Sequence, residues 1–492
     1  MFTCKKFHRY LALVLALIML IALSACGGSG SPALQQTTVA SANSEASTQS
    51  ATQAETQTAD QIEAQPATQP ETQSPAQPDA EKTQLYWMCW GHPRNIEIKM
   101  EAMEKSRPDL YDKYELIAVV AGPGPGDLAD RLRLTLASNE TLPDIAQLSS
   151  DLMPEFVQAG VLADLSDQYT DAIKANLTDG ALELVTFDGK QYAYVYMYGL
   201  LSWVYRSDLF AEAGINVADI KDVDDLIEAG KKFHQHFPDK YITNFVPEMA
   251  AGGDMGRFVW ILSGNGGRYV DEAGNYIFNA DPGVRAALLD LKKLYDSGVC
   301  VNISEWTPDW EQGFADGTIA SSLIASWIKD AAFMSTYAPD TAGLWDVALF
   351  PDFGGAKGGG SQFGGSVTFI MKDAPHAKEA IEVMTAMVLD KDGALANYVA
   401  AGGGLPPVLK DAFNDPIVSK PDPFWGTRMW EMEQEMMKSF KVFPFTPASM
   451  LEDKIIAPYV QRYLRGEIEL DNMLNSVNND LLLQIGNPYD LN

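Results

Sequence analysis

Cysteine is scarce in this chain of 492 residues, which contains only 4 cysteines. That number is too small for a scaffold held together by disulfide bonds. Positive charge is also in short supply, because 36 lysines and arginines stand against 66 aspartates and glutamates and leave a net charge of −30. A surface of this charge repels nucleic acid and anionic lipid head groups. We therefore expect no nucleic-acid partner.

Motifs for catalysis and cofactor binding are missing as well. The sequence has no Gly-x-Ser-x-Gly elbow, no His-Glu-x-x-His pair and no Gly-Lys-Ser/Thr phosphate loop. The glycine-rich stretch VVAGPGPGDLADRL is a poor phosphate loop, because Pro123 and Pro125 lack the amide donors that a phosphate needs. His234 and His236 lie two residues apart and would face different sides of a helix. We expect no enzyme activity, no cofactor and no metal.

No apolar run near the N-terminus is long enough to span a bilayer. The stretch from Leu11 to Leu23 is shorter than the roughly 20 residues that a spanning helix needs. It follows a basic segment and precedes small residues, which is the order of an export signal. We expect residues 1–25 to be removed. Leu23-Ser24-Ala25-Cys26 resembles a bacterial lipobox, which implies a lipidated Cys26 and a cell-membrane lipoprotein on the extracytoplasmic side; the alternative is an ordinary buried cysteine.

Aromatic residues are absent between 27 and 84, where Ser, Thr, Gln, Ala and Pro dominate. Such a segment cannot bury enough apolar surface to offset its ordering entropy, so residues 26–84 are predicted to be a disordered tether. Residues 85–492 are long enough for two domains. They keep Cys89 and Cys300, and the sequence leaves open whether these two pair, although we expect isolated thiols.

Short β-rich runs alternate with amphipathic stretches through the rest of the chain. This alternation predicts α/β domains with mainly parallel sheets, in which ligands bind beyond the carboxyl ends of the strands. The amphipathic stretches include 127–138, 223–236, 282–297 and 377–390. The β-rich runs are LYWMCWG at 85, YELIAVV at 114, DIAQLSS at 144, YAYVYMYGLLSWVYR at 192, WDVALFP at 345 and SVTFIMK at 366.

A series of blocks resembles the family 1 extracellular solute-binding proteins, the maltose-type receptors of ABC importers. The blocks occur in the family's order: LASNETLPDIAQLSS, AGVLADLSD, FDGKQYAYVYMYGLLSWVYRSDLFAEAGI, VWILSGNGGRYVDEAGNYIF, FADGTIASSLIASWIKD and AAGGGLPPV. The resemblance implies a two-lobed periplasmic-binding-protein-like fold with the ligand cleft between the lobes. Each lobe would be discontinuous, with 85–198 plus 364–401 in the N-lobe and 199–363 plus 402–492 in the C-lobe. It also implies a receptor that captures a carbohydrate, expected to be an oligosaccharide, by lobe closure and delivers it to a membrane permease. We expect this receptor to be a monomer.

The same resemblance nominates ligand-binding residues. Trp327, in IASWIKD, matches the position of the family's stacking tryptophan, and sugar rings stack their C–H faces on indole rings. Asp151 falls where the maltose-type pattern has a sugar-binding aspartate. The remaining candidates follow strand ends, lie at a lobe crossing or lie where the C-lobe supplies polar contacts: Trp90, His92, Ser149, Ser150, Asp254, Arg257, Gly365 and Ser366.

Two other functions stay open on the sequence alone. A receptor for another small solute, such as a polyamine, a peptide or a modified sugar, would suit so acidic a chain. A surface hydrolase acting on polysaccharide would use a pair of carboxylates, but almost any two could be nominated here.

Overall fold

The computed structural model describes residues 81–490, apart from residues 92, 139, 253–255, 330–333, 358–360, 426, 427 and 439. The predicted signal, Cys26 and almost all of the predicted tether therefore lie outside the described residues, as do His92 and Asp254. Within the described ranges, no helix combines the length and the apolar character that crossing a membrane requires.

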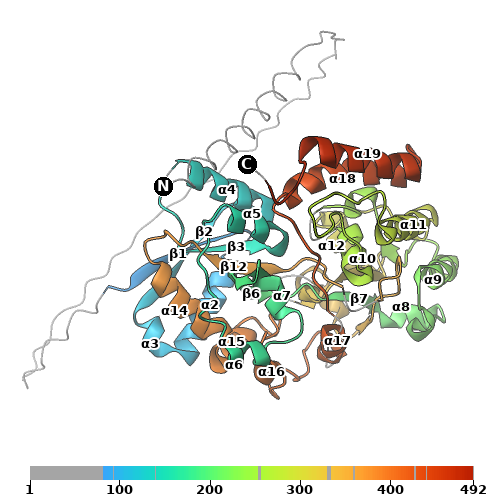
Figure 1. Ribbon diagram of the computed structural model, residues 1–492. Coiled ribbons are helices and arrows are strands. Elements are labelled where there is room, and N and C mark those ends of the chain that lie inside the picture. The colour runs from blue at the N-terminus through green and yellow to red at the C-terminus, as the bar shows by residue number, and fades with distance from the viewer. Residues whose placement is uncertain are drawn as a thin grey trace, which may run out of the picture. The chain divides into compact units, whose positions relative to one another are not determined.

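The larger of the two main sheets has five strands. Its strand order is β2-β1-β3-β12-β6, so a strand from late in the chain lies between two early ones (Figure 1). β1 pairs in parallel with β2 and β3, whereas β12 runs antiparallel to β3 and β6. Helices α2, α14 and α15 lie on one side of this sheet, and α4 and α5 lie on the other. The strands are Thr83–Cys89 (β1), Tyr114–Val120 (β2), Ile145–Ser149 (β3), Ala193–Met197 (β6) and Ser366–Ile370 (β12).

A second sheet has the order β10-β7-β11 and is antiparallel throughout. The prediction of mainly parallel sheets is wrong for this sheet and for β12. For β12 the reason is the route of the chain: β6 ends and β12 begins at the same place, where the chain passes between the sheets, so these two strands must run in opposite directions. The strands are Leu201–Arg206 (β7), Ser321–Ala325 (β10) and Trp345–Ala348 (β11), with two short pairs formed by Thr186–Phe187 (β4) and Lys190–Gln191 (β5), and by Thr243–Asn244 (β8) and Cys300–Val301 (β9).

Helices cover both sheets, and their starts follow from the sequence. Asp222 and Asp281 accept backbone N–H groups at the starts of α9 and α11, and Thr307 does so at the start of α12. The longer helices are Arg94–Ser106 (α2), Pro125–Ser138 (α4), Val223–His236 (α9), Arg257–Asn265 (α10), Pro282–Asp296 (α11), Pro308–Asp316 (α12), Ala377–Val388 (α14), Lys391–Ala400 (α15), Arg428–Met437 (α17), Ser449–Leu464 (α18) and Leu470–Gln484 (α19).

Shorter helices complete the secondary structure. The α-helices among them are Pro108–Tyr111 (α3), Met153–Gln158 (α5), Asp171–Asn176 (α6), Ala181–Val185 (α7), Ser207–Glu212 (α8), Met334–Tyr337 (α13) and Lys410–Phe413 (α16). The 3-10 helices are Ser150–Leu152 (η1), Val217–Asp219 (η2), Pro247–Met249 (η3), Ser326–Lys329 (η4) and Pro339–Thr341 (η5). The predicted boundaries between the lobes stay a prediction. Shortly after the predicted boundary between residues 401 and 402, the carbonyl of Val408 accepts the backbone N–H of Thr178.

Both cysteines of the described residues are free thiols, with Cys89 buried and Cys300 partly buried. This answers the question that the sequence left open. Burial raises the pKa of both thiols, that of Cys300 to about 12, so neither is a ready nucleophile at neutral pH.

Candidate functional site

Two segments that connect the sheets, residues 199–200 and 362–364, lie against each other. We call this place the crossing. Leu200 and Gln362 form an isolated antiparallel bridge, and the backbone N–H of Phe363 donates to the carbonyl of Gly199 at 2.7 Å. The approach is so close that a Cβ on Gly199 would lie 2.0 Å from the carbonyl oxygen of Gly364. Only glycine fits there without moving the backbone.

Polar residues gather beside this crossing, at the end of β3. Ser149 lies opposite Ser366 in the strand register, and the backbone N–H of Ser150 donates to the carbonyl of Gly365 at 3.4 Å. The Ser149 hydroxyl donates to Asp151 at 2.5 Å. The structure therefore brings together these five residues, all of them predicted ligand contacts. Their role in ligand binding stays a prediction.

Asp151 is buried, and burial raises the pKa of its carboxyl to about 6. The hydrogen bond from Ser149 acts in the opposite direction, while the charge of Asp453 on α18 adds to the increase. Helix α18, which carries Asp453, packs against η1, which directly follows β3. A carboxylate in this position can accept hydrogen bonds from hydroxyl groups of a bound ligand.

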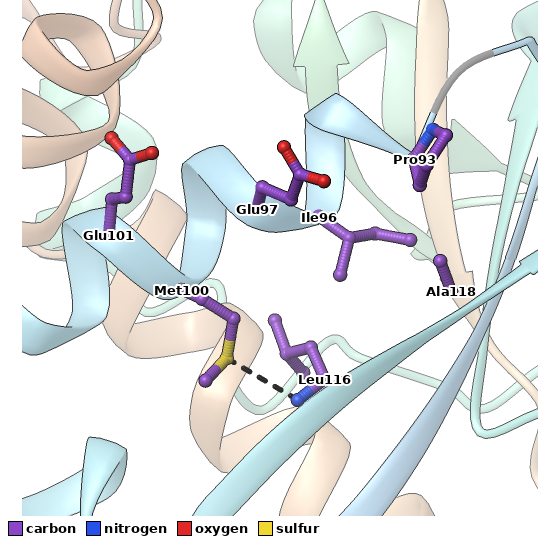
Figure 2. Close-up of a pocket in the computed structure, with 7 residues that line it drawn as sticks. All are labelled: Pro93, Ile96, Glu97, Met100, Glu101, Leu116 and Ala118. Atoms are coloured by element: carbon purple, nitrogen blue, oxygen red, sulfur yellow. Dashed lines mark hydrogen bonds between the residues drawn. The ribbon is translucent and has the colours of Figure 1, made fainter. Parts of the chain in front are cut away.

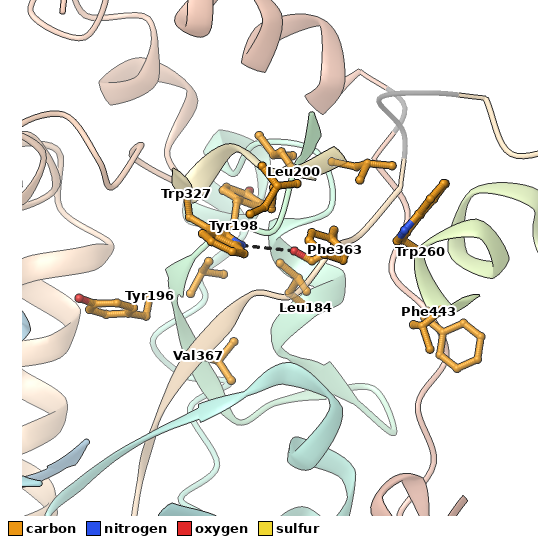
Figure 3. Packing of buried hydrophobic residues seen from close by; sticks show 14 of the residues in the cluster. Leu184, Tyr196, Tyr198, Leu200, Trp260, Trp327, Phe363, Val367 and Phe443 are labelled. Atoms are coloured by element: carbon orange, nitrogen blue, oxygen red, sulfur yellow. Dashed lines mark hydrogen bonds between the residues drawn. The ribbon is translucent and has the colours of Figure 1, made fainter. Parts of the chain in front are cut away.

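An aromatic stack lies at the crossing and includes Phe363. Trp327 is in η4, directly after β10, and its indole N–H donates to the carbonyl of Phe363 at 3.4 Å (Figure 3). Its ring lies nearly parallel to those of Phe363 and Trp306, with interplanar angles of 13° and 26° and centroid distances of 6.4 and 5.6 Å. We call these three residues the ring stack. Trp327 is only 4% exposed, whereas Trp306 is 47% exposed.

Arg257, a predicted ligand contact, lies at the start of α10 and has a protein partner. Its guanidinium makes two hydrogen bonds to Glu305, at 2.5 and 3.3 Å, and the two side chains are only 4% and 7% exposed. The same guanidinium lies over the Phe363 ring, 4.8 Å from its centroid. Arg257 thus joins the ring stack to the loop that carries Glu305.

Trp306 follows Glu305 directly and has an unusual backbone. Its φ is 63°, in the left-handed region, which a bulky side chain rarely adopts. Holding a residue other than glycine there costs about 1–3 kcal/mol, and such residues cluster at functional sites. Sequence reasoning missed Glu305 and Trp306 as site residues, because neither a left-handed φ nor a distant ion pair leaves a local sequence signal.

The 3-10 helix η4, which carries Trp327, is held at its C-terminal end by an ion pair. Lys329 forms an ion pair of 2.9 Å with Glu433 on α17. Glu433 is fully buried, and burial raises the pKa of its carboxyl, while Lys329 acts in the opposite direction. The pair ties η4 to α17 and so restrains the position of the Trp327 ring.

Trp90 lies at the end of β1, as predicted, and packs against the hydrophobic core. The turn that follows it is fixed by a hydrogen bond of 2.8 Å from the backbone N–H of Gly91 to the carbonyl of Gly122. Its role in ligand binding stays a prediction.

A pocket of about 390 Å³ opens elsewhere, between α2 and β2 (Figure 2). Its lining includes Ile96, Met100 and Leu116, and the backbone N–H of Leu116 donates to the Met100 sulfur at 3.3 Å. Glu97 and Glu101 also line the pocket, and both pair with Arg94. None of the predicted site residues that the structure describes lines this pocket, so we do not identify it as the ligand site.

Comparison with known proteins adds to this picture. A family model described as "Bacterial extracellular solute-binding protein" matches residues 111–423. A lactose-binding protein of Rhizobium radiobacter is 25% identical over 363 residues, which cover 70% of this chain and 79% of the relative. An arabinooligosaccharide-binding protein of Bacillus subtilis is 27% identical over 313 residues, which cover 62% of this chain and 69% of the relative.

The fold also matches solved structures. One is a binding protein associated with an ABC transporter of B. animalis subsp. lactis, in complex with β-1,6-galactobiose. It superimposes with a TM-score of 0.67 at 23% identity, covering 82% of this chain and 97% of the other. This likeness confirms the predicted α/β fold of two lobes. The position of β12 between β3 and β6 shows that the first lobe is built from separate stretches of the chain.

Proposed function

Because this chain belongs to the bacterial extracellular solute-binding proteins, we propose that it captures a neutral carbohydrate, a disaccharide or longer, for an ABC importer. The family binds solutes, so the chain is a binding protein and not an enzyme, and the hydrolase alternative is set aside. The lactose-binding and arabinooligosaccharide-binding relatives support a carbohydrate as the solute.

The observation that carries the proposal is the ring stack beside a polar cluster. An indole ring offers a sugar an apolar face, while Asp151 and the serines beside it offer partners for hydroxyl groups. Both lie next to the crossing between the lobes, where closure would enclose a ligand. The captured sugar would then pass to the permease subunits of the importer.

A thermal-shift screen tests the proposal. A ligand that binds only the native state raises the unfolding temperature, and at about 100 times its Kd it adds about 2.7 kcal/mol of stability. We expect at least one neutral disaccharide or oligosaccharide to raise the unfolding temperature. Stabilisation by polyamines or peptides alone would contradict the carbohydrate assignment.

We also propose that the mature protein is a monomer anchored to the membrane by a lipid on Cys26. Support comes from the sequence: a short apolar run that ends in Leu-Ser-Ala-Cys, followed by a tether without aromatic residues. An anchor holds the receptor near its importer and raises its effective concentration there. Cys26→Ala should release the protein from membranes without changing ligand affinity; retention of this variant would contradict the anchor. Light scattering on the released protein gives its oligomeric state.

A further inference from the structure

The tryptophan that the family resemblance assigns to sugar stacking has little surface left for a sugar. Trp327 is 4% exposed, and the rings of Phe363 and Trp306 lie nearly parallel to its ring. Trp306, in contrast, ends the ring stack with 47% of its surface exposed. A large exposed aromatic ring at the edge of a buried stack is a preformed apolar surface.

The surroundings of Trp306 fix its position from both sides. On the N-terminal side, Glu305 is held by the two buried hydrogen bonds from Arg257. On the C-terminal side, the Thr307 hydroxyl donates to the carbonyl of Ser304 at 2.8 Å and accepts the backbone N–H of Trp310 at 3.3 Å, at the start of α12. These bonds hold Trp306 in its left-handed conformation, which glycine or asparagine would adopt with less strain.

We propose that Trp306, and not Trp327, presents the ring on which the ligand stacks. Trp327 and Phe363 lie behind this ring and support it, and the Arg257–Glu305 pair positions it. The strained backbone is then explained, because it places an indole at the exposed end of the ring stack while its neighbours stay anchored. This inference rests on the proposed function and adds to it the residue that determines affinity for sugars.

Substitutions at Trp306 test the inference by calorimetric titration with the neutral sugar that gives the largest thermal shift. Trp306→Gly removes the ring and relieves the backbone, so we expect at least about a tenfold loss of affinity with an unchanged or higher unfolding temperature. Trp306→Asn should behave alike, because asparagine tolerates the left-handed region; it serves as the second variant if the glycine chain folds poorly. Trp306→Phe keeps a ring and should keep most of the affinity.

The control is Tyr86→Ala, which removes an exposed ring from β1 and should leave the affinity unchanged.

The positioning role of Glu305 has its own readout. Glu305→Gln should weaken binding in the wild-type background but cause no further loss when combined with Trp306→Gly, because the pair acts only through the ring. Additive losses would overturn the positioning role. Wild-type affinity in a folded Trp306→Gly or Trp306→Asn chain would overturn the inference and leave the proposed function standing. A wild-type chain that binds no neutral sugar would overturn both.

Discussion

The side-chain amide of Gln362 donates a hydrogen bond of 2.7 Å to the hydroxyl oxygen of Ser150. Its side-chain oxygen accepts the backbone N–H of Phe443 at 3.1 Å, and its own backbone N–H donates to Ser263 at 3.0 Å. Gln362 is fully buried. One residue at the crossing therefore joins the end of β3, helix α10 and the segment before α18, through its side chain and its backbone N–H.

Replacing Gln362 with leucine should destabilise the protein by about 1–3 kcal/mol, because the buried N–H of Phe443 loses its acceptor. Urea denaturation measures the difference. The matched control is Gln484→Leu at the exposed end of α19, which should stay within about 0.5 kcal/mol of the wild type. Equal stabilities of the two variants would mean that the Gln362 bonds do not hold the crossing together.

Replacing Gly199 with alanine should lower the stability of the folded protein, whereas replacing Gly126 with alanine should raise it. At Gly199 the added methyl group would lie 2.0 Å from a backbone oxygen, so the two segments of the chain must separate, which costs about 1–3 kcal/mol or more. At Gly126, within α4, a Cβ meets nothing within 4 Å, so Gly126→Ala should stabilise by about 0.5–1 kcal/mol. The unfolding temperatures of the two alanine variants should therefore move in opposite directions. A Gly199→Ala chain as stable as the wild type would contradict the close approach.

Glu452 on α18 makes the stability depend on pH. Burial raises the pKa of its carboxyl to about 7, although hydroxyl groups of Tyr276 and Thr446 donate to it at 2.8 and 2.9 Å. Between about pH 4.5 and pH 7 the native state holds this proton and the unfolded state does not, so stability falls as the pH rises through that range. Asp151 contributes in the same direction, from about pH 3.8 to about pH 6. Glu452→Gln should flatten the curve of unfolding free energy between pH 4.5 and pH 7; an unchanged slope would contradict this account.

Lys99 makes the folding stability depend on pH in the opposite direction, and at higher pH. Its side chain is 4% exposed and points its amine toward the Tyr196 ring, 5.4 Å from the centroid. Burial lowers its pKa to about 7. Between about pH 7 and pH 10.5 the unfolded state holds the proton that the native state has lost, so stability rises with pH.

Lys99→Met should therefore stabilise the protein at pH 7, on the order of 1–3 kcal/mol, because it replaces a buried polar group with an apolar one of similar length. Denaturation at pH 7 and pH 9 measures the effect, which should shrink at the higher pH. Lys105→Met, at an exposed position of the same helix, is the control and should change little. Destabilisation by Lys99→Met would show that the amine has a favourable role in the native state.

The sequence predicted the fold through the order of its blocks, and it predicted the cluster at the end of β3 because polar residues there directly follow a buried strand. It nominated Trp327 as the stacking ring, which stays a prediction, and it did not show that this ring is buried. Other features depend on contacts between residues far apart in the chain. Glu305 meets Arg257 across 48 positions, and Gln362 meets Ser150 across 212. No local pattern encodes such pairs.

Strand direction in β12 and in the second sheet was predicted wrongly for a related reason. Alternation of strands and helices favours parallel pairing, but it does not show where the chain passes from one sheet to the other. The left-handed backbone of Trp306 was likewise hidden, since tryptophan is not a residue that signals a positive φ.

Calorimetric titration of the purified protein with neutral disaccharides and oligosaccharides, at low and at high salt, tests the central claim most directly. Neutral sugars carry no charge for salt to screen, whereas a cationic solute bound by so acidic a chain would lose affinity as salt rises. The account predicts one sugar bound per protein, with the same Kd at both salt concentrations. Failure of every neutral sugar to bind, or binding only of a cationic solute whose affinity falls with salt, would contradict it.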